Sequence, residues 1–322
     1  MSASRDAPKP AANGERARAA KPRKRVGIVA KRSAWTIHVE EGGDDRLRRL
    51  VAREDPTVAA LVASHLQHQR TVLEVQEALA AEGAEAAFLL RAGDAFDASG
   101  LDLVVTVGGD GTLLGASHFV PDGVPVLGIN SAPAHSVGFF CGATSGELAS
   151  AIRAALAGEL RRTVLTRMEV RVNDQVVAAR VLNDALFCHA SPAATSRYIL
   201  QLGEREEQQK SSGFWIGPAA GSTAAQRSAG GRVLPLMSKQ LQLVVREPYT
   251  PHDETYEIRH ALIPPGEKLI VRSKIHEARI FVDGPDTVVE LGYGDVTEFT
   301  QAPEPLVVLG IASRRKWHRG RE

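Results

Sequence analysis

The sequence predicts an α/β fold in two parts, with a parallel α/β domain over residues 25–160 and a β-rich domain over residues 161–302. Two observations predict this division. Around the continuous apolar run Leu101–Val107, strand-like and helix-like segments alternate, as they do in a parallel sheet. After residue 160, short strand-like segments separated by turns replace the helices, which is typical of antiparallel sheets.

The first part contains four predicted strands and two predicted helices. Leu101–Val107 is almost entirely Leu and Val, as a strand buried on both faces must be. The other segments are strands over Val26–Ala30, Ala86–Leu90 and Val124–Ile129, and helices over Thr57–Ala81, which Gly83 ends, and Thr112–Phe119. This order predicts a Rossmann-like parallel sheet.

The second part follows a predicted helix over Ser145–Leu160. Leu165–Val172 alternates between apolar and polar residues, and Asn173-Asp174 forms a turn before Gln175–Ala179. Further short strands are predicted over Val181–Phe187, Tyr198–Leu202, Leu241–Val245, Leu269–Arg272 and Ala278–Val282. We expect a β-sandwich-like domain, with a ligand cleft between the two halves. Residues 303–322 are predicted as a C-terminal strand and a basic tail that packs back on the first domain.

Composition excludes several classes of protein. A chain of 322 residues has room for about two domains, and 43% hydrophobic against 24% charged residues excludes wholesale disorder. No apolar run has the length of a membrane span, and no apolar signal-peptide core follows Met1. Only Cys141 and Cys188 are present, which excludes a disulfide scaffold and favours a reducing, cytoplasmic location.

Positive charge is concentrated at the N-terminus. Residues 1–25 carry eight Lys/Arg and two acidic residues, a net charge of +6, whereas the rest of the chain has −5. Without apolar periodicity, this segment predicts a disordered basic arm over residues 1–24. Most short basic tails are solvated, and the same applies to Arg314–Arg319, so no nucleic-acid partner is expected.

The most informative segment is the glycine turn Gly108-Gly109-Asp110-Gly111-Thr112, which follows the buried strand. Glycines permit close backbone approach, and free N–H groups at the start of a helix bind phosphate. Asp110 would repel phosphate unless a metal ion or an attacking hydroxyl lies between them. Phosphoryl transfer requires such a group, so the turn predicts a phosphotransferase.

Two alternatives fit the same turn. Asp110 could simply cap the helix. The spacing of Gly109, Gly111 and Gly115 also loosely resembles the dinucleotide fingerprint of dehydrogenases, but Asn130 follows the next strand where a ribose-binding acid is expected. The motif G-x-x-x-x-G-K-[ST] of standard P-loop enzymes is absent from the sequence.

With three further segments in the same order, the chain resembles the NAD kinase family over most of residues 26–310. The glycine turn by itself is shared with related lipid kinases and phosphofructokinases. The segments that narrow the resemblance are Leu127–Asn130, Leu182-Asn183-Asp184, and Gly221–Ala224 followed by Ser228–Gly231, with a late Asp283-Gly284. The long loop from Asn130 to Gly138 and Lys210-Ser211-Ser212-Gly213 look most like the mitochondrial and plant NADH-kinase-like branch.

The resemblance implies transfer of the γ-phosphoryl group of ATP to the adenosine-ribose 2′-hydroxyl of NAD or NADH, with Mg²⁺ or another divalent cation. Asp110 would accept the hydroxyl proton. The residues implied in binding are Gly108, Gly109, Gly111 and Thr112 for phosphates, Asn183 and Asp184 for adenosine and ribose, and Lys210, Ser212, Thr223, Ala224 and Ser228 for the rest of the dinucleotide. A homo-oligomer, a dimer or a tetramer, is expected by analogy, and no membrane partner is expected.

The chain departs from the family pattern at three places. Pro218-Ala219-Ala220-Gly221 stands where the family usually has a Thr-Pro-Thr-Gly run, and Ala225 stands where it usually has Tyr. Ser212 stands where a carboxylate commonly faces the nicotinamide. Loss of that acid removes a reason to prefer the positively charged ring, so we expect NADH to be accepted as well as NAD. Two other functions stay open at this stage: a lipid kinase of the same superfamily, and a dinucleotide sensor without activity.

Other residues are given no catalytic role. His65 and His68 have a spacing that can bind metal, but a third ligand is not evident. Neither Cys141 nor Cys188 belongs to a C-x-x-C motif, so both are expected to be unreactive thiols.

Overall fold

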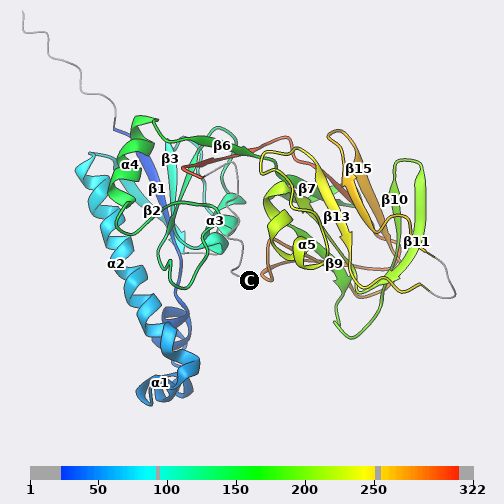
Figure 1. Cartoon of the computed structure of the whole chain (residues 1–322), viewed down its shortest axis with the longest axis horizontal. Coiled ribbons are helices and arrows are strands. Elements are labelled where there is room, and N and C mark those ends of the chain that lie inside the picture. Colours follow the sequence, from blue (N-terminus) through cyan, green and yellow to red (C-terminus); the bar gives the residue numbers. More distant parts are fainter. Residues whose placement is uncertain (1–22, 92–94, 251–254, 312–322) are drawn as a thin grey trace, which may run out of the picture.

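The computed structural model describes residues 23–91, 95–250 and 255–311. These residues form a seven-stranded sheet flanked by helices and two six-stranded sheets, which lie on the left and right of Figure 1. The basic arm predicted over residues 1–24 lies outside the described residues except for its last two, and the basic segment from residue 312 lies wholly outside them. The predicted class, a parallel α/β part followed by a β-rich part, is confirmed.

The first sheet has the strand order β2-β1-β3-β4-β19-β6, with β5 also paired to β4. Its strands are β1 (Arg25–Ala30), β2 (Glu85–Arg91), β3 (Leu103–Gly108), β4 (Val126–Asn130), β5 (Cys141–Thr144), β6 (Arg162–Leu165) and β19 (Leu306–Leu309). Only β6, which pairs antiparallel with β19, breaks the parallel arrangement among the described strands. The central strand β3 is buried along its whole length, as its continuous apolar sequence predicts.

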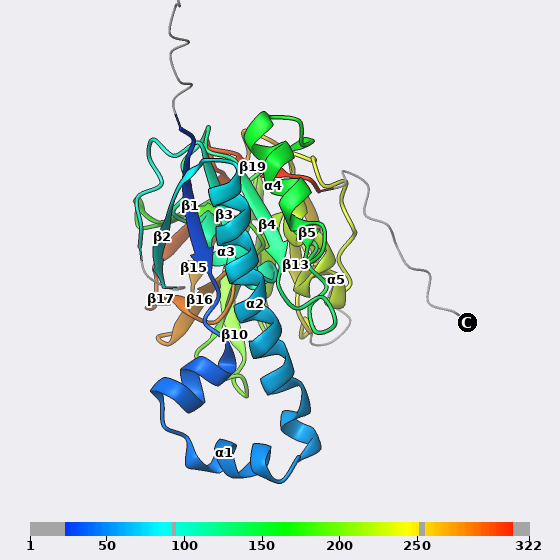
Figure 2. The same cartoon turned by 90° about the vertical axis from the view of Figure 1, so that its left-hand side faces the viewer.

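The helices of this part are η1 (Thr36–Glu41), α1 (Asp45–Ala52), η2 (Pro56–Val58), α2 (Ala59–Ala81), α3 (Asp110–Ser117) and α4 (Leu148–Ala157). Of these, α2, α3 and α4 cover the two faces of the sheet. Because strand side chains alternate between faces, Val105 packs with α2 and α4, whereas Val104 packs with α3. Figure 2 shows α2 in front of the sheet, with α1 beyond its lower end. No helix in the described ranges has the length and apolar content to cross a membrane.

The β-rich part is a sandwich of two antiparallel sheets. One contains β7 (Met168–Val172), β8 (Gln175–Val181), β10 (Ser196–Leu202), β11 (Arg205–Ser211), β15 (Lys268–Ser273) and β18 (Val296–Gln301). The other contains β9 (Ala185–His189), β12 (Phe214–Pro218), β13 (Leu241–Val245), β14 (His260–Ile263), β16 (Ala278–Val282) and β17 (Thr287–Leu291). Phe187 and Phe214 of one sheet pack with Tyr198 and Phe299 of the other, at ring-centroid distances of 5.3–6.0 Å.

Two predicted strands are wrong as single elements. The segment Leu165–Val172 ends one strand, β6, and begins another, β7, in a different sheet, with Arg167 between them. The segment Val181–Phe187 likewise splits into the end of β8 and the beginning of β9. Apolar alternation reports which side chains are buried but not which sheet a strand joins. The chain therefore passes between the halves just after β6, and it returns before β19.

Candidate active site

The glycine turn lies at the carboxyl end of β3. Gly108 ends the strand, Gly109 is extended (φ −118°, ψ −164°), and α3 begins at Asp110 rather than at the predicted Thr112. A side chain at Gly108 would collide with Thr112, so packing requires glycine there. At Gly111 an added Cβ would meet no heavy atom within 4 Å. The glycine at that exposed position is therefore not explained by contacts within the described residues.

The Asp110 carboxylate is held by backbone N–H groups of a distant loop. Phe139 N donates to Asp110 Oδ2 at 3.0 Å, and Phe140 N donates to Oδ1 at 2.8 Å. The same loop is tied by Asn130, whose side-chain amide donates to Ser136 O at 3.0 Å. Each carboxylate oxygen has a second acceptor position, so Asp110 is oriented but not saturated. No signal in the sequence identified Phe139 and Phe140.

The predicted pair Asn183-Asp184 forms a tight turn between β8 and β9. Three successive backbone N–H groups, those of Leu182, Asn183 and Asp184, donate to the carboxylate of Asp283 at 2.7–3.0 Å. Asn183 Nδ2 also donates to Asp184 Oδ2 at 3.0 Å. The late Asp-Gly motif noted in the sequence therefore shapes this turn, a role that the sequence alone did not reveal.

Asp184 has an unusual acidity. Its side chain lies almost out of contact with solvent, with 5% of the residue exposed. Burial, followed by the negative charge of Asp283, raises the pKa of Asp184 to about 7. A carboxyl group with a pKa near neutrality exchanges a proton readily at physiological pH, which is typical of functional sites.

The second glycine-rich segment packs directly on this turn. It forms η3 (Ala219–Thr223) and α5 (Ala225–Ser228), and a side chain at Gly221 would collide with the Asn183 carbonyl. Gln226 Nε2 donates to the same carbonyl at 3.4 Å. Thr223 and Ala224 thus lie near Asn183 and Asp184. A ligand can reach both of them, because they are only partly buried, and it can also reach Ser228, which is exposed.

Lys210 and Ser212 are not brought to the same place. Lys210 lies near the end of β11, and Ser212, whose backbone N–H donates to Arg246 O at 3.1 Å, lies in the link that leads into β12. Thr223 follows the other end of β12. Five strand residues separate these ends by roughly 17 Å. The structure therefore brings the Asn183-Asp184 turn and the second glycine-rich segment together, and leaves Lys210 and Ser212 apart. Helix α3, which begins at the glycine turn, shares a buried apolar cluster with Leu182 and Ala220 through Leu113 and Leu114.

The residues that the sequence analysis set aside have structural roles. His65 Nδ1 lies 2.7 Å from Ser33 Oγ, and His68 Nδ1 lies 2.9 Å from Ser131 Oγ. Burial lowers the pKa of His68 to about 4, so this ring is neutral. Burial also raises the pKa of the Cys141 thiol, to about 12, which keeps it protonated and unreactive.

Two of the cavities in the described part of the chain are lined by residues other than Asp110, Asn183 and Asp184. One, of about 330 Å³, is lined by Asp102 and Leu103 at the opposite end of β3 from the glycine turn. The other, of about 370 Å³, is lined by Phe96, Phe119 and Arg180. Ligands of open α/β sheets bind at the carboxyl ends of the strands, so the open surface at Asp110 is the better candidate for the chemistry.

Comparison with known proteins gives a matching family and solved structures of the same fold. Residues 26–160 match the family described as the ATP-NAD kinase N-terminal domain. Among solved structures, an NAD kinase from Archaeoglobus fulgidus in complex with ATP superposes with a TM-score of 0.62 at 19% identity, covering 88% of this chain and 92% of that one. Yeast NADH kinase complexed with NADH gives the same TM-score at 17% identity, covering 92% and 85%. These likenesses show the shared fold.

Relatives found by sequence have a higher identity to this chain than these two structures. A rice protein (Oryza sativa subsp. japonica) named "Probable NADH kinase" is 35% identical over 231 residues, which cover 65% of this chain and 71% of the relative. The NADH kinase of Arabidopsis thaliana is 33% identical, over 62% of this chain and 70% of the relative. Identity of this level over more than two thirds of the rice protein, together with the matched domain, shows that the chain belongs to the NAD kinase family.

Proposed function

We propose that the chain transfers the γ-phosphoryl group of ATP to the 2′-hydroxyl of the adenosine ribose of NAD or NADH, with Asp110 as the proton acceptor. As a member of the NAD kinase family the chain is a phosphotransferase. One observation carries the residue assignment. A carboxylate oriented by two backbone N–H groups begins a helix at the carboxyl end of a buried parallel strand, beside an exposed glycine.

The glycine turn suits the phosphates of ATP. Free N–H groups at the start of α3 attract anions, and the open surface at Gly111 permits a phosphate to lie against the backbone. Lys31, which follows β1, lies beside Gly108 and adds a positive charge at the same edge of the sheet. Gly109 and Thr112 complete this proposed phosphate site.

Asp110 suits the acceptor hydroxyl. As the 2′-oxygen forms its bond to the γ-phosphorus, the bond from that phosphorus to the bridging oxygen of ADP breaks, and the hydroxyl proton passes to Asp110. Catalysis by such a site is mostly alignment of the two oxygens in line and neutralisation of charge. The two backbone N–H groups from Phe139 and Phe140 hold the carboxylate in one orientation for this step.

The second half suits the dinucleotide. A ribose diol needs acceptors, and Asn183 and Asp184 supply an amide and a carboxyl group on one tight turn. Thr223, Ala224 and Ser228 are proposed to line the same dinucleotide site from η3 and α5. The binding of the dinucleotide by Lys210 and Ser212, which precede β12, remains a prediction. In support, solved structures of this fold hold ATP in one case and NADH in another.

Mg²⁺ bound to the phosphates of ATP is compatible with this proposal. Mg²⁺ keeps several waters and is usually held by one or two carboxylates together with substrate phosphates. No group of three or more His, Cys, Asp or Glu side chains that could hold a metal occurs among the described residues. We therefore propose that Mg²⁺ binds together with the phosphates of ATP, and that the carboxylate of Asp110 lies near it. When bound, the cation would neutralise phosphate charge.

The test is a kinase assay with the Asp110→Asn variant. Purified protein with ATP, Mg²⁺ and NAD or NADH should yield NADP or NADPH. Asp110→Asn should lower kcat by roughly 10²- to 10⁴-fold, because the proton acceptor is lost, with dinucleotide affinity nearly unchanged. Asp45→Asn, at the first residue of α1, is the matched control and should keep full activity. Full turnover by Asp110→Asn would exclude Asp110 as the base.

A second prediction concerns the nicotinamide ring. Because Ser212 provides no carboxylate, the chain should phosphorylate NADH with a kcat/KM comparable to that for NAD. The measurement compares the two dinucleotides at equal ATP, and the variant Ser212→Asp should shift the preference towards NAD. A strong NAD preference of the unchanged protein would contradict the prediction.

The relatives give no support to a lipid kinase or a sensor without activity. The expected homo-oligomer and the cytoplasmic location stay predictions. Sedimentation of the purified protein would measure the subunit number.

A further inference from the structure

Asp283 is a buried carboxylate with several partners. It follows β16 in a left-handed conformation (φ 49°), and its side chain is 2% exposed. Besides the three N–H groups of residues 182–184, its own N–H donates to Asp184 O at 2.9 Å. The Asn183-Asp184 turn is thus wrapped around one charged group. A charge buried in this way has to be paired, and Asp283 has one further partner besides these backbone groups.

That partner comes from the other half of the molecule. His118, the residue that follows α3, places Nε2 3.0 Å from Asp283 Oδ2. A carboxylate can only accept, so Nε2 of His118 carries the proton. The His118 side chain is 19% exposed, which shields the contact from water. The helix that begins at Asp110 is therefore joined, at its other end, to the group that shapes the Asn183-Asp184 turn.

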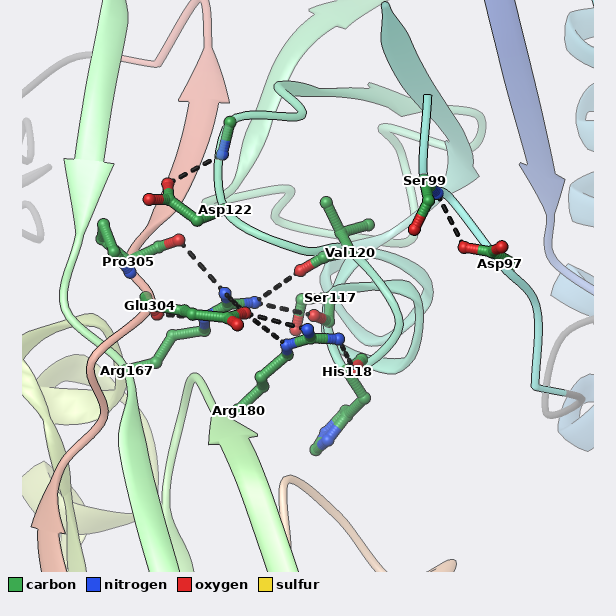
Figure 3. Close-up of polar contacts among 11 residues, drawn as sticks. Asp97, Ser99, Ser117, His118, Val120, Asp122, Arg167, Arg180, Glu304 and Pro305 are labelled. Atoms are coloured by element: carbon green, nitrogen blue, oxygen red, sulfur yellow. Dashed lines mark hydrogen bonds and ion pairs between the residues drawn. The ribbon is translucent and has the colours of Figure 1, made fainter. Parts of the chain in front are cut away.

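Further contacts fix the same end of α3. Arg180 Nη1 donates to His118 O at 3.2 Å, and Arg167 Nη1 donates to Ser117 O at 3.0 Å and to Val120 O at 2.9 Å (Figure 3). Both arginines belong to the second half. An eight-residue helix is about 12 Å long and stiff, so fixing its end also fixes Asp110 at its start.

We propose that His118 and Asp283 are positioning residues of the phosphoryl transfer, which set the distance between Asp110 and the dinucleotide turn. The inference rests on the proposed function. Asp110 and Asn183-Asp184 belong to different halves, and a misplacement of 1 Å can lower a rate by roughly 10²-fold. A contact that links both elements through two side chains is suited to prevent such a misplacement.

The test separates this role from a merely structural one. Replacement His118→Leu removes the N–H donor and leaves Asp283 with its three backbone donors, so the fold should persist. We expect kcat/KM for the dinucleotide to fall by roughly 10- to 100-fold, with KM for ATP nearly unchanged. His118→Gln, whose side-chain amide can donate to Asp283, should restore most of the activity. His38→Leu, at an exposed histidine of η1, is the matched control.

A second variant acts from the other side of the contact. Asp283→Asn should lower kcat/KM for the dinucleotide further, with a lower melting temperature, because the amide cannot accept from all four donors. The positioning role is overturned if His118→Leu matches the wild type, if His118→Gln fails to restore activity, or if KM for ATP rises as much as that for the dinucleotide. Wild-type protein that forms no NADP or NADPH would instead overturn the proposed function, and the positioning role with it.

Discussion

Asp184 is a carboxyl group that the protein holds out of water beside another carboxylate. Its pKa of about 7 compares with about 3.9 in an unfolded chain. Between these values the native state binds a proton that the unfolded state does not. The stability due to Asp184 is therefore fully present below about pH 4, decreases as the pH rises to about 7, and is constant above that.

This loss of stability with rising pH can be measured. Between pH 5 and pH 8, the free energy of unfolding of the wild type should fall relative to Asp184→Asn, because asparagine resembles the protonated acid and does not titrate. The difference should be on the order of 2–3 kcal/mol, at about 1.4 kcal/mol for each pH unit up to 7. Urea unfolding at both pH values measures it, with Asp174→Asn in an exposed turn as control. Parallel pH profiles of wild type and Asp184→Asn would contradict the raised pKa.

At the scale of elements, the two glycine-rich segments and α3 contain two kinds of glycine. Gly108 and Gly221 are required by packing, because their absent side chains leave room for Thr112 and for the Asn183 carbonyl. Gly111 and Gly115 face open space, and glycine in a helix costs about 1 kcal/mol relative to alanine. The helix therefore keeps a destabilising residue in its first turn, where the proposed phosphates would lie.

Replacement of Gly111 by alanine separates stability from function. Gly111→Ala should leave the free energy of unfolding unchanged or raise it by up to about 1 kcal/mol. Its kcat/KM for ATP should nevertheless fall at least tenfold, since the methyl group would occupy the space of a phosphate. Gly115→Ala, one turn further along α3, is the matched control and should gain similar stability with activity retained. Normal ATP kinetics for Gly111→Ala would argue against phosphate at this position.

The accuracy of the sequence predictions also differs between elements. The strands over 26–30, 241–245 and 278–282 and the helix ending at Ala81 agree with the structure within a residue or two, because their periodicity is uninterrupted. The strand over 181–187 was wrong because the apolar pair Val181-Leu182 and the apolar run Ala185–Phe187 read as one strand in the sequence. What breaks the strand is Asp283, a hundred residues away in the chain, whose carboxylate binds the backbone N–H groups that a ladder would use.

At the scale of the whole molecule, Arg167 holds the two halves together. It lies between β6 and β7, is 0% exposed, and donates to four backbone carbonyls, those of Ser117, Val120, Glu304 and Pro305 (Figure 3). Burial lowers the pKa of Arg167 to about 10, which still leaves it charged at neutral pH. One side chain therefore contacts the end of α3 and the segment by which the chain returns to the first sheet.

Loss of this arginine should weaken the whole fold. Arg167→Met should lower the free energy of unfolding by about 3 kcal/mol or more, because several buried carbonyls lose their donor. Arg167→Lys should recover only part of this, since one ammonium cannot reproduce the guanidinium fork. Arg171→Met, at an arginine whose side chain is 40% exposed and paired with Glu169, is the control and should cost less than about 1 kcal/mol. Equal urea midpoints for Arg167→Met and Arg171→Met would contradict this role.

The amino-acid sequence alone was sufficient for the fold class, for the glycine turn with Asp110 and for the resemblance to the family, because these depend on local spacing and on residue types in order. It could not show that Phe139, Phe140, His118, Arg167 and Asp283 organise the candidate site. Their roles arise from contacts between residues that are 29 to 165 positions apart. Such contacts exist only after the sheets have packed, when a buried charge or carbonyl must find its partner wherever the chain brings one.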